Sequence, residues 1–271
     1  MVMTMRHSVG VKTLHDQRRS LVTWSTSVVL LVGMYAGFYP SFHRSSAYSD
    51  VINQMPKALR DLFTAGIGID FSSGAGYVYM EMLSFMAPML VILYAVNAGA
   101  NAIAGEEEHH TLDLLLSTPV SRTRVTVEKA VALCAGVLAI ATAMGIALVA
   151  FGAAADMGLD TGNIAAAMVH LALLGLVFGA IALAVGAATG RVGVARGVAA
   201  LVAVVTYLVN GFAPNVSWIH PLQKLSPFYQ YLGNDPIRHG ISLTSVAVAV
   251  ATAAVLAAVA VWSFRRRDLA A

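Results

Sequence analysis

The residues best placed to do chemistry lie in one short polar segment, GEEEHHTLDLLLSTPVSR, at residues 105–122. It opens with three consecutive carboxylates, Glu106, Glu107 and Glu108, followed by two adjacent histidines. Carboxylates and imidazoles can bind metals, but adjacent histidines project from different faces of a helix, and no His-Glu-x-x-His motif occurs in the sequence. The segment is therefore better suited to ion pairs with a basic partner than to metal binding.

The same segment has the pattern of a short amphipathic helix. Glu106–Glu108 suit the positive N-terminal end of a helix, and Leu112, Leu115 and Leu116 recur at the spacing of one helical face. Pro119 is expected to end the helix, because proline disfavours helical geometry in the residue before it. The pattern is equally typical of an interfacial helix that only covers a membrane bundle.

The elements that carry this segment follow from an apolar composition. Of the 271 residues, 58% are hydrophobic and 11% are charged, and the mean hydropathy is +0.73. In soluble domains about a quarter of the residues are charged. The chain is therefore predicted to be an integral membrane protein. Its net charge of +3 indicates no nucleic-acid partner, because the sequence contains no basic soluble domain.

Six apolar segments are long enough to cross about 30 Å of hydrocarbon as helices. The first is not followed by a signal-peptide cleavage site, so we expect it to stay in the protein. The predicted fold is all-α, with one transmembrane domain over residues 1–271 and a short cytoplasmic helix between the second and third spans. The predicted spans are 21–39, 77–104, 127–154, 164–189, 194–212 and 241–264.

The distribution of lysine and arginine predicts the orientation. With the N-terminus in the cytoplasm, twelve of the seventeen basic residues fall on the cytoplasmic side, as the positive-inside rule favours. Both termini are then cytoplasmic. The twelve are Arg6, Lys12, Arg18, Arg19, Arg122, Arg124, Lys129, Arg191, Arg196, Arg265, Arg266 and Arg267.

Ionisable residues are nearly absent from the spans. Ion-coupled carriers normally keep such residues at membrane depth, and the candidates here are Glu81 and His170. We expect Glu81 to lie at headgroup level and His170 to be a hydrogen-bonded residue of the bundle. Asn97 and Asn101, one turn apart, are expected to bond across helices, although they could equally line a substrate path.

Other chemistries are excluded by missing motifs. The sequence has no glycine-rich phosphate loop and no Gly-Lys dipeptide, so the chain is not expected to hydrolyse ATP itself. The spans contain no aspartate and no convincing serine–histidine pair for intramembrane proteolysis. The single cysteine, Cys134, lies in an apolar run and provides neither a disulfide nor a metal site. We expect no enzyme activity, cofactor or metal on this chain.

Three stretches resemble the permeases of the ATP-binding-cassette type-2 family. Residues 107–129, with their TLDLLLSTPVSR core and a lysine opening the next span, are similar to the family's cytoplasmic signature. Residues 14–25 resemble its interfacial connecting helix, and residues 224–240, with SPFYQY, resemble its outer region before the last span. For the SPFYQY motif, an aromatic belt at the outer interface and a partly re-entrant helix are equally good interpretations.

The resemblance implies a coupling helix, from about Glu106 to Ser117, that docks into a separate cytoplasmic ATPase, which binds ATP and Mg. It further implies a second permease subunit, identical or related, and export of a drug, antibiotic, lipid or similar substrate across the plasma membrane. The alanine- and valine-rich composition hints at a bacterial source. The residues that the resemblance assigns to ATPase coupling are Glu106, Glu107, Glu108, Thr111, Leu112, Leu115, Leu116, Ser117, Thr118 and Pro119.

Two alternatives use the same polar segment differently. In one, the chain is a channel or carrier that needs no ATPase, and the glutamates gate it. In the other, it is a membrane scaffold that recruits a cytoplasmic protein.

Overall fold

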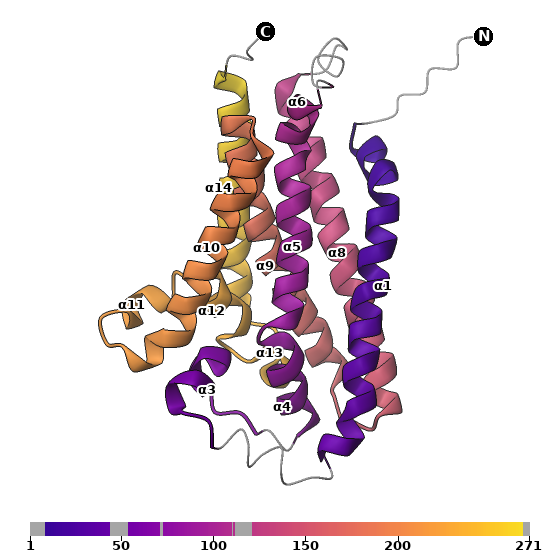
Figure 1. Ribbon diagram of the computed structural model, residues 1–271, viewed down its shortest axis with the longest axis vertical. Coiled ribbons are helices and arrows are strands. Elements are labelled where there is room, and N and C mark those ends of the chain that lie inside the picture. The colour runs from indigo at the N-terminus through magenta and orange to yellow at the C-terminus, as the bar shows by residue number, and fades with distance from the viewer. Residues whose placement is uncertain (1–8, 44–53, 71–72, 110, 112–120, 268–271) are drawn as a thin grey trace, which may run out of the picture.

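The structure is a computed structural model that describes residues 9–43, 54–70, 73–109, 111 and 121–267. Within these ranges the chain is helical and contains no strand. The long helices stand side by side, and α1 begins and α14 ends at the same end of the bundle (Figure 1). We name this the terminal end and the opposite one the far end.

Five of the long elements are continuous helices, and one is interrupted. The continuous helices are α1 (Val9–His43), α8 (Arg122–Ala154), α9 (Thr161–Thr189), α10 (Val192–Phe212) and α14 (Leu243–Arg266). Two π-helical turns, which are common at functional sites, break the second span. Its parts are α4 (Gly74–Val78), η1 (Tyr79–Leu83, π), α5 (Met86–Ala100), η2 (Asn101–Gly105, π) and α6 (Glu106–Glu108).

The prediction of six spans is confirmed. The described residues include six helical segments long and apolar enough to cross a membrane. Gly190 ends α9 with a φ of 67°, which glycine adopts readily, so a tight turn separates the fourth span from the fifth. The segments are Arg18–Phe42, Gly74–Glu108, Arg122–Ala154, Thr161–Thr189, Val192–Asn215 and Leu243–Arg266.

Helix α9 forms the centre of the bundle and packs against α5, α8, α10 and α14. Its most apolar stretch is 72% buried, against 17% for the first, fifth and sixth spans. Close approach to α5 depends on glycine, because a Cβ on Gly99 would collide with the carbonyl oxygen of Gly179. A Cβ on Gly175 would come within 2.5 Å of Val91 Cγ1. The small residues spaced by four along α9 thus form a seam with the second span.

Helix α1 is peripheral and packs mainly on α8 (Figure 1). Residues 14–25, which resemble the family's interfacial connecting helix, are continuous with the first span, since α1 runs unbroken from Val9 to His43. The physical reason is local: residues 11–32 contain neither proline nor glycine to interrupt the helix. Of the two glycines spaced by four in α1, a Cβ on Gly33 would lie 3.4 Å from the Phe151 ring, while a Cβ on Gly37 would meet nothing within 4 Å.

Short helices close the far end. One, α3 (Lys57–Thr64), contacts α10, and the others follow α10 in the sequence: η3 (Ala213–Asn215), α11 (His220–Gln223), α12 (Pro227–Leu232) and α13 (Pro236–His239). The carboxylate of Asp61 on α3 accepts hydrogen bonds from Lys57 at 2.5 Å and from the Asn215 amide at 2.9 Å. This network ties the loop before the second span to the end of the fifth.

The SPFYQY motif turns inward. Phe228, Tyr231 and Leu232 of α12 are buried, and the Tyr231 hydroxyl donates to the carbonyl oxygen of Leu83 at 3.1 Å. The Ser226 hydroxyl donates to the carbonyl of Thr206, inside α10, at 2.9 Å. The described structure therefore favours the partly re-entrant helix over an aromatic belt, because these rings pack among the spans.

Candidate functional site

The three glutamates of the polar segment lie at the end of a helix. The prediction that Glu106–Glu108 begin a helix is wrong: they form α6, the last turn of the second span. Carboxylates are disfavoured at a helix C-terminus, where the macrodipole is negative. Partners from other parts of the chain offset this cost, one set for each glutamate.

Glu106 pairs with the third span. Its carboxylate lies 2.6 Å from the ammonium of Lys129 on α8, whose side chain is only 7% exposed. The second carboxylate oxygen accepts a hydrogen bond of 2.6 Å from the Thr111 hydroxyl. A buried lysine needs such a partner, because an unpaired charge in that position is strongly destabilising. The pair fixes the terminal ends of the second and third spans relative to each other.

Glu107 pairs with the residue that follows the sixth span. Its carboxylate accepts a hydrogen bond from the guanidinium of Arg267, which also donates to the carbonyl oxygen of Ala187 at 3.2 Å. The Glu107 carboxylate lies so close to Gly190 that a Cβ there would meet it within about 2.5–2.7 Å. Glu107 therefore joins α14 to the turn between α9 and α10.

Glu108 caps the fifth span. One carboxylate oxygen accepts a hydrogen bond of 2.8 Å from the backbone N–H of Val192, the first residue of α10. The positive end of the α10 dipole favours a carboxylate here. A glutamate misplaced at the end of one helix is thus well placed at the start of another.

Arg122, at the start of α8, completes the arrangement. Its guanidinium donates to the carbonyl oxygens of Phe264 at 3.1 Å and Arg267 at 2.7 Å, and lies over the Phe264 ring. These are carbonyls that the end of a helix leaves without partners. We name the whole group of contacts the terminal clamp, which consists of Glu106, Glu107, Glu108, Arg122, Lys129, Val192 and Arg267.

The segment expected to contact an ATPase begins and ends beside the terminal clamp. Thr111 is bonded to Glu106, and Ser121 caps α8 by accepting a hydrogen bond of 3.2 Å from the Arg124 N–H. The rest of the predicted coupling set lies outside the described residues: Leu112, Leu115, Leu116, Ser117, Thr118 and Pro119. Their role stays a prediction.

The sequence does not identify the partners of the three glutamates. In the sequence, Arg122 and Arg267 contribute only to the positive-inside signal, and the backbone N–H of Val192 has no sequence signature. The run of three arginines after the last span could have indicated a partner for an acidic run. Nothing in the sequence says which glutamate it would meet.

The two asparagines of the second span do not bond across helices, which corrects that expectation for the described residues. The Asn101 amide donates to the Asn97 carbonyl at 2.7 Å and to the Asn97 side-chain oxygen at 3.2 Å, along one helix. Asn97 is exposed and continues a stripe with Met89 and Leu93, which are 37% and 52% exposed. The Asn97 amide therefore lies at membrane depth on an open face.

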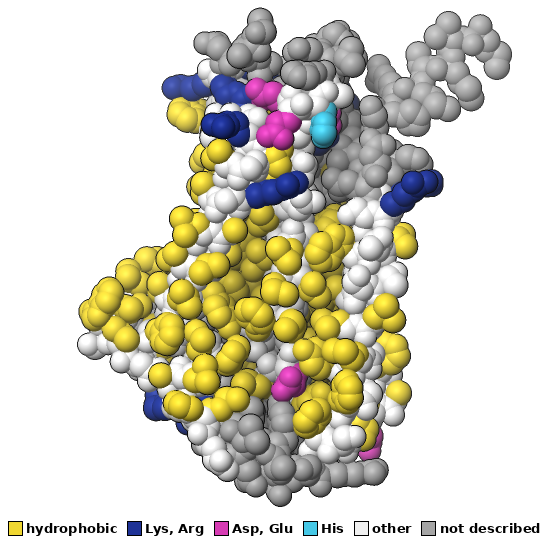
Figure 2. Space-filling model, in the orientation of Figure 1, with side chains coloured by type: hydrophobic (Ala, Val, Ile, Leu, Met, Phe, Trp, Pro, Cys, Tyr) yellow, Lys and Arg dark blue, Asp and Glu magenta, His cyan; other side chains and the backbone are white. Residues whose placement is uncertain are grey.

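An apolar groove of about 350 Å³ borders this stripe between α5 and α10. Phe85, Met89 and Leu93 line one wall, and Val204 and Tyr207 line the other. Figure 2 shows the same face as a broad apolar band, with basic side chains gathered at the terminal end. The shape and lining suit an apolar or amphipathic occupant better than an ion.

His170 is a bonded residue of the bundle, as expected. It is 3% exposed, and both ring nitrogens have backbone partners. Among the described residues no group of three or more histidine, cysteine, aspartate or glutamate side chains could hold a metal ion.

Six apolar spans, an all-helical bundle and a charged network at one end define a multi-pass integral membrane protein. The family model of the ABC-2 family transporter proteins matches residues 9–269, and the chain belongs to that family. Members are transmembrane components that associate with an ATP-binding-cassette ATPase and are not themselves the ATPase. No match was found among curated proteins.

Proposed function

We propose that this chain is the permease subunit of an export-type ATP-binding-cassette transporter, with the terminal end in the cytoplasm. A separately encoded ATPase would bind ATP and Mg and dock on residues 112–120. The observation that carries the proposal is the terminal clamp, because it joins the flanks of that segment to the second, third, fifth and sixth spans. A displacement of residues 112–120 by the ATPase would then be transmitted to these four spans together.

The terminal clamp supports a revised role for the glutamates. They bind Lys129, Val192 and Arg267 of their own chain. We therefore infer that they anchor the coupling segment to the spans and do not themselves contact the ATPase. The ATPase would instead contact residues 112–120, in which Leu112, Leu115 and Leu116 form one predicted helical face. Movement of the ATPase would be passed from that face to Thr111 and Ser121 at its two ends.

The open face of α5 and α10 supports a dimer with a shared path. Polar side chains at membrane depth normally face the interior of a bundle or a water-filled cavity. The exposed Asn97 amide satisfies that rule if a second permease subunit, identical or related, covers this face. The apolar groove beside it would then line the path of an amphipathic drug, antibiotic or lipid.

Affinity purification tests the proposal directly. The chain, tagged after its last residue and extracted from its native membrane in mild detergent, should bring a soluble ATPase in stoichiometric amount together with ATP hydrolysis. Leu115→Asp should lose the ATPase while still inserting in the membrane. A chain that purifies without any ATPase, under conditions that preserve known complexes, would argue for a carrier or channel instead.

A further inference from the structure

The far end is closed by a segment that enters the bundle, here named the plug and defined as residues 226–242. It contains α12 and α13 and leads into α14. Its side chains reach α10 through Ser226 and the second span through Tyr231. Its backbone is held by a third element, α9, which contributes two side chains from one face.

His170 makes the deeper of these two contacts. Its Nδ1 lies 3.1 Å from the carbonyl oxygen of Gln230 on α12, and its Nε2 lies 3.2 Å from the backbone nitrogen of Ser242, which caps α14. His170 is nine residues beyond Thr161, which places it about 14 Å along α9 at 1.5 Å per residue. One ring thus joins two backbone segments that are twelve residues apart in sequence.

The partners determine the form of the imidazole. A carbonyl oxygen can only accept, so Nδ1 must carry a proton, and a backbone N–H can only donate, so Nε2 must be bare. This is the neutral ring protonated at Nδ1. A proton added at Nε2 would face the Ser242 N–H and remove that hydrogen bond, while leaving the bond to Gln230.

Asn163 makes the second contact, two turns earlier on α9. Its amide donates to the carbonyl oxygen of Arg238 at 3.0 Å. Residues seven apart share one helical face, so Asn163 and His170 both bind the backbone of the plug from the same face of α9. Only the histidine contact can change with pH.

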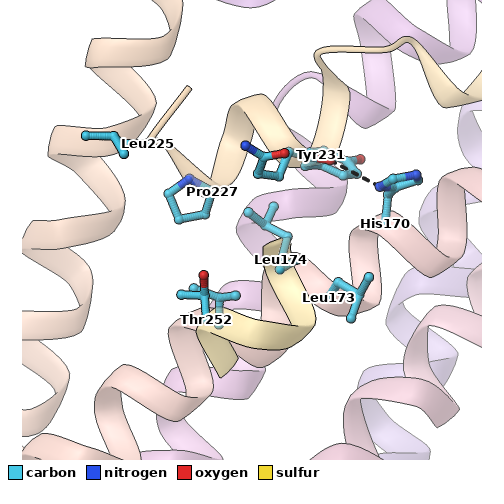
Figure 3. Close-up of a pocket in the computed structure, with 10 residues that line it drawn as sticks. His170, Leu173, Leu174, Leu225, Pro227, Tyr231 and Thr252 are labelled. Carbon is cyan, nitrogen blue, oxygen red and sulfur yellow. Dashed lines mark hydrogen bonds between the residues drawn. The ribbon is translucent and has the colours of Figure 1, made fainter. Parts of the chain in front are cut away.

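The site has room for water beside the ring. A small cavity of about 40 Å³ lies between α9, α12 and α14, lined by His170, Gln230 and Thr252 among others (Figure 3). A water molecule needs roughly 10–15 Å³ of such space, so the cavity has room for water beside the imidazole.

The plug carries titratable side chains of its own. The titratable side chains of the plug are Tyr229, Tyr231, Asp235, Arg238 and His239, whereas residues 243–264 of α14 and the far half of α8 carry none. Burial raises the pKa of Asp235, against the opposing charges of Arg238 and His239. A pH response of the plug must therefore be separated from protonation of Asp235.

We propose that His170 is a pH-sensitive positioning residue that holds the plug closed in its neutral form and releases the junction with α14 when it is protonated. The release would ease opening of the far end at low pH. That consequence for export rests on the proposed function, whereas the contact and its release do not.

Nitrogen-15 NMR of the purified full chain, uniformly labelled with nitrogen-15, tests the form of the ring. Near pH 7.5 His170 should show a protonated Nδ1 and a bare Nε2, with the Ser242 amide shifted by its hydrogen bond. Acidification to about pH 4, below the range in which exposed histidines titrate because burial disfavours the charged ring, should protonate Nε2 and move the Ser242 signal with it. A ring still bare at Nε2 at that pH would overturn the proposal. A ring protonated at Nε2 near pH 7.5 would overturn the proposal.

Spin labels report the plug itself. With Cys134 replaced by alanine, labels at Ile241→Cys in the plug and Ile146→Cys on α8, both exposed positions, should give one narrow distance near pH 7.5. The distribution should broaden or shift as His170 is protonated. An unchanged distance with a fully protonated His170 would also overturn the proposal.

Three variants separate the effects. His170→Gln keeps one donor and one acceptor but cannot titrate, so its distance should stay narrow at both pH values. Asp235→Asn and the exposed-site control His239→Gln should respond to pH as the unmodified chain does. If Asp235→Asn abolishes the response and His170→Gln keeps it, the switch is the carboxylate and the proposal is wrong. None of these measurements needs an ATPase or transport.

Discussion

Glu108, the last residue of the second span, accepts a 2.8 Å hydrogen bond from the backbone N–H of Val192, the first residue of the fifth. The carboxylate sits at the negative end of its own helix and at the positive end of another. The two spans are thereby coupled through one side chain. Glu108 is therefore stabilised by the N-terminus of α10 and not by the helix to which it belongs.

That contact makes a graded prediction. Glu108→Ala should lower the stability of the purified chain by about 1 kcal/mol, because the α10 N-terminus loses an acceptor. Glu108→Gln keeps an oxygen in place and should lose less. Thermal unfolding in detergent measures both, and equal losses for alanine and glutamine would mean that the Val192 bond contributes nothing.

Charge exchange tests the pair between Glu107 and Arg267. Arg267→Glu should reduce stability by roughly 1–3 kcal/mol, because two carboxylates would then face each other. Glu107→Arg combined with Arg267→Glu should recover part of the loss. Recovery should be incomplete, since the carbonyl of Ala187 also loses its donor. A double variant as unstable as the sum of the two singles would contradict the pairing.

Substitutions in residues 112–120, the proposed ATPase-docking segment, should have different effects from substitutions in the terminal clamp. Leu115→Asp should abolish ATPase recruitment and export at unchanged stability, whereas Glu107→Lys with Glu108→Lys should reduce stability and export together. Leu243→Asp is the matched control, because Leu243 is 75% exposed and opens α14 at the far end. Co-purification and unfolding curves distinguish these outcomes. Normal export by all the variants would contradict the proposal that this segment and the terminal clamp transmit movement of the ATPase to the spans.

The glycine seam predicts a contrast between two similar substitutions. Gly99→Ala should destabilise the chain by about 1–3 kcal/mol, because the new methyl group meets the backbone of Gly179. Gly37→Ala, with open space around it, should be neutral or slightly stabilising through helix propensity. Unfolding temperatures of the two variants give the comparison, and similar values would show that α5 and α9 do not approach as described.

Asp61 at the far end predicts a pH dependence. Burial opposes its ionisation, but hydrogen bonds from Lys57 and Asn215 and the charges of Lys57 and Arg60 outweigh burial and lower its pKa. Its contribution to stability is therefore present above the unfolded pKa, near 4, and is lost as the pH falls through the lower folded value. Asp61→Asn should remove this acid-dependent part of the unfolding curve. An unchanged pH profile in that variant would contradict the assignment.

Much of the fold could be predicted from local patterns. Six apolar runs, each long enough to span a bilayer, appear in the sequence without reference to any other part of the chain. The Ser121 cap of α8 and the turn at Gly190 are likewise set by neighbouring residues.

The terminal clamp could not be predicted in this way, because its contacts are distant in sequence. Glu106, Glu107 and Glu108 find partners 23, 160 and 84 residues away. The local pattern placed these carboxylates at the start of a helix, where they would be stabilised without help. Instead, the second span, interrupted by two π-helical turns, extends as far as these carboxylates and ends with them.

The sequence by itself determined that this chain crosses a membrane six times, which parts of it are polar, and which family it resembles, because hydropathy and short motifs are local properties. Only the tertiary structure decided which helix end each glutamate neutralises, that SPFYQY turns inward, and that His170 grips a plug. Those features depend on how helices far apart in the chain come to lie beside one another, and that is set by packing around the glycines of α9.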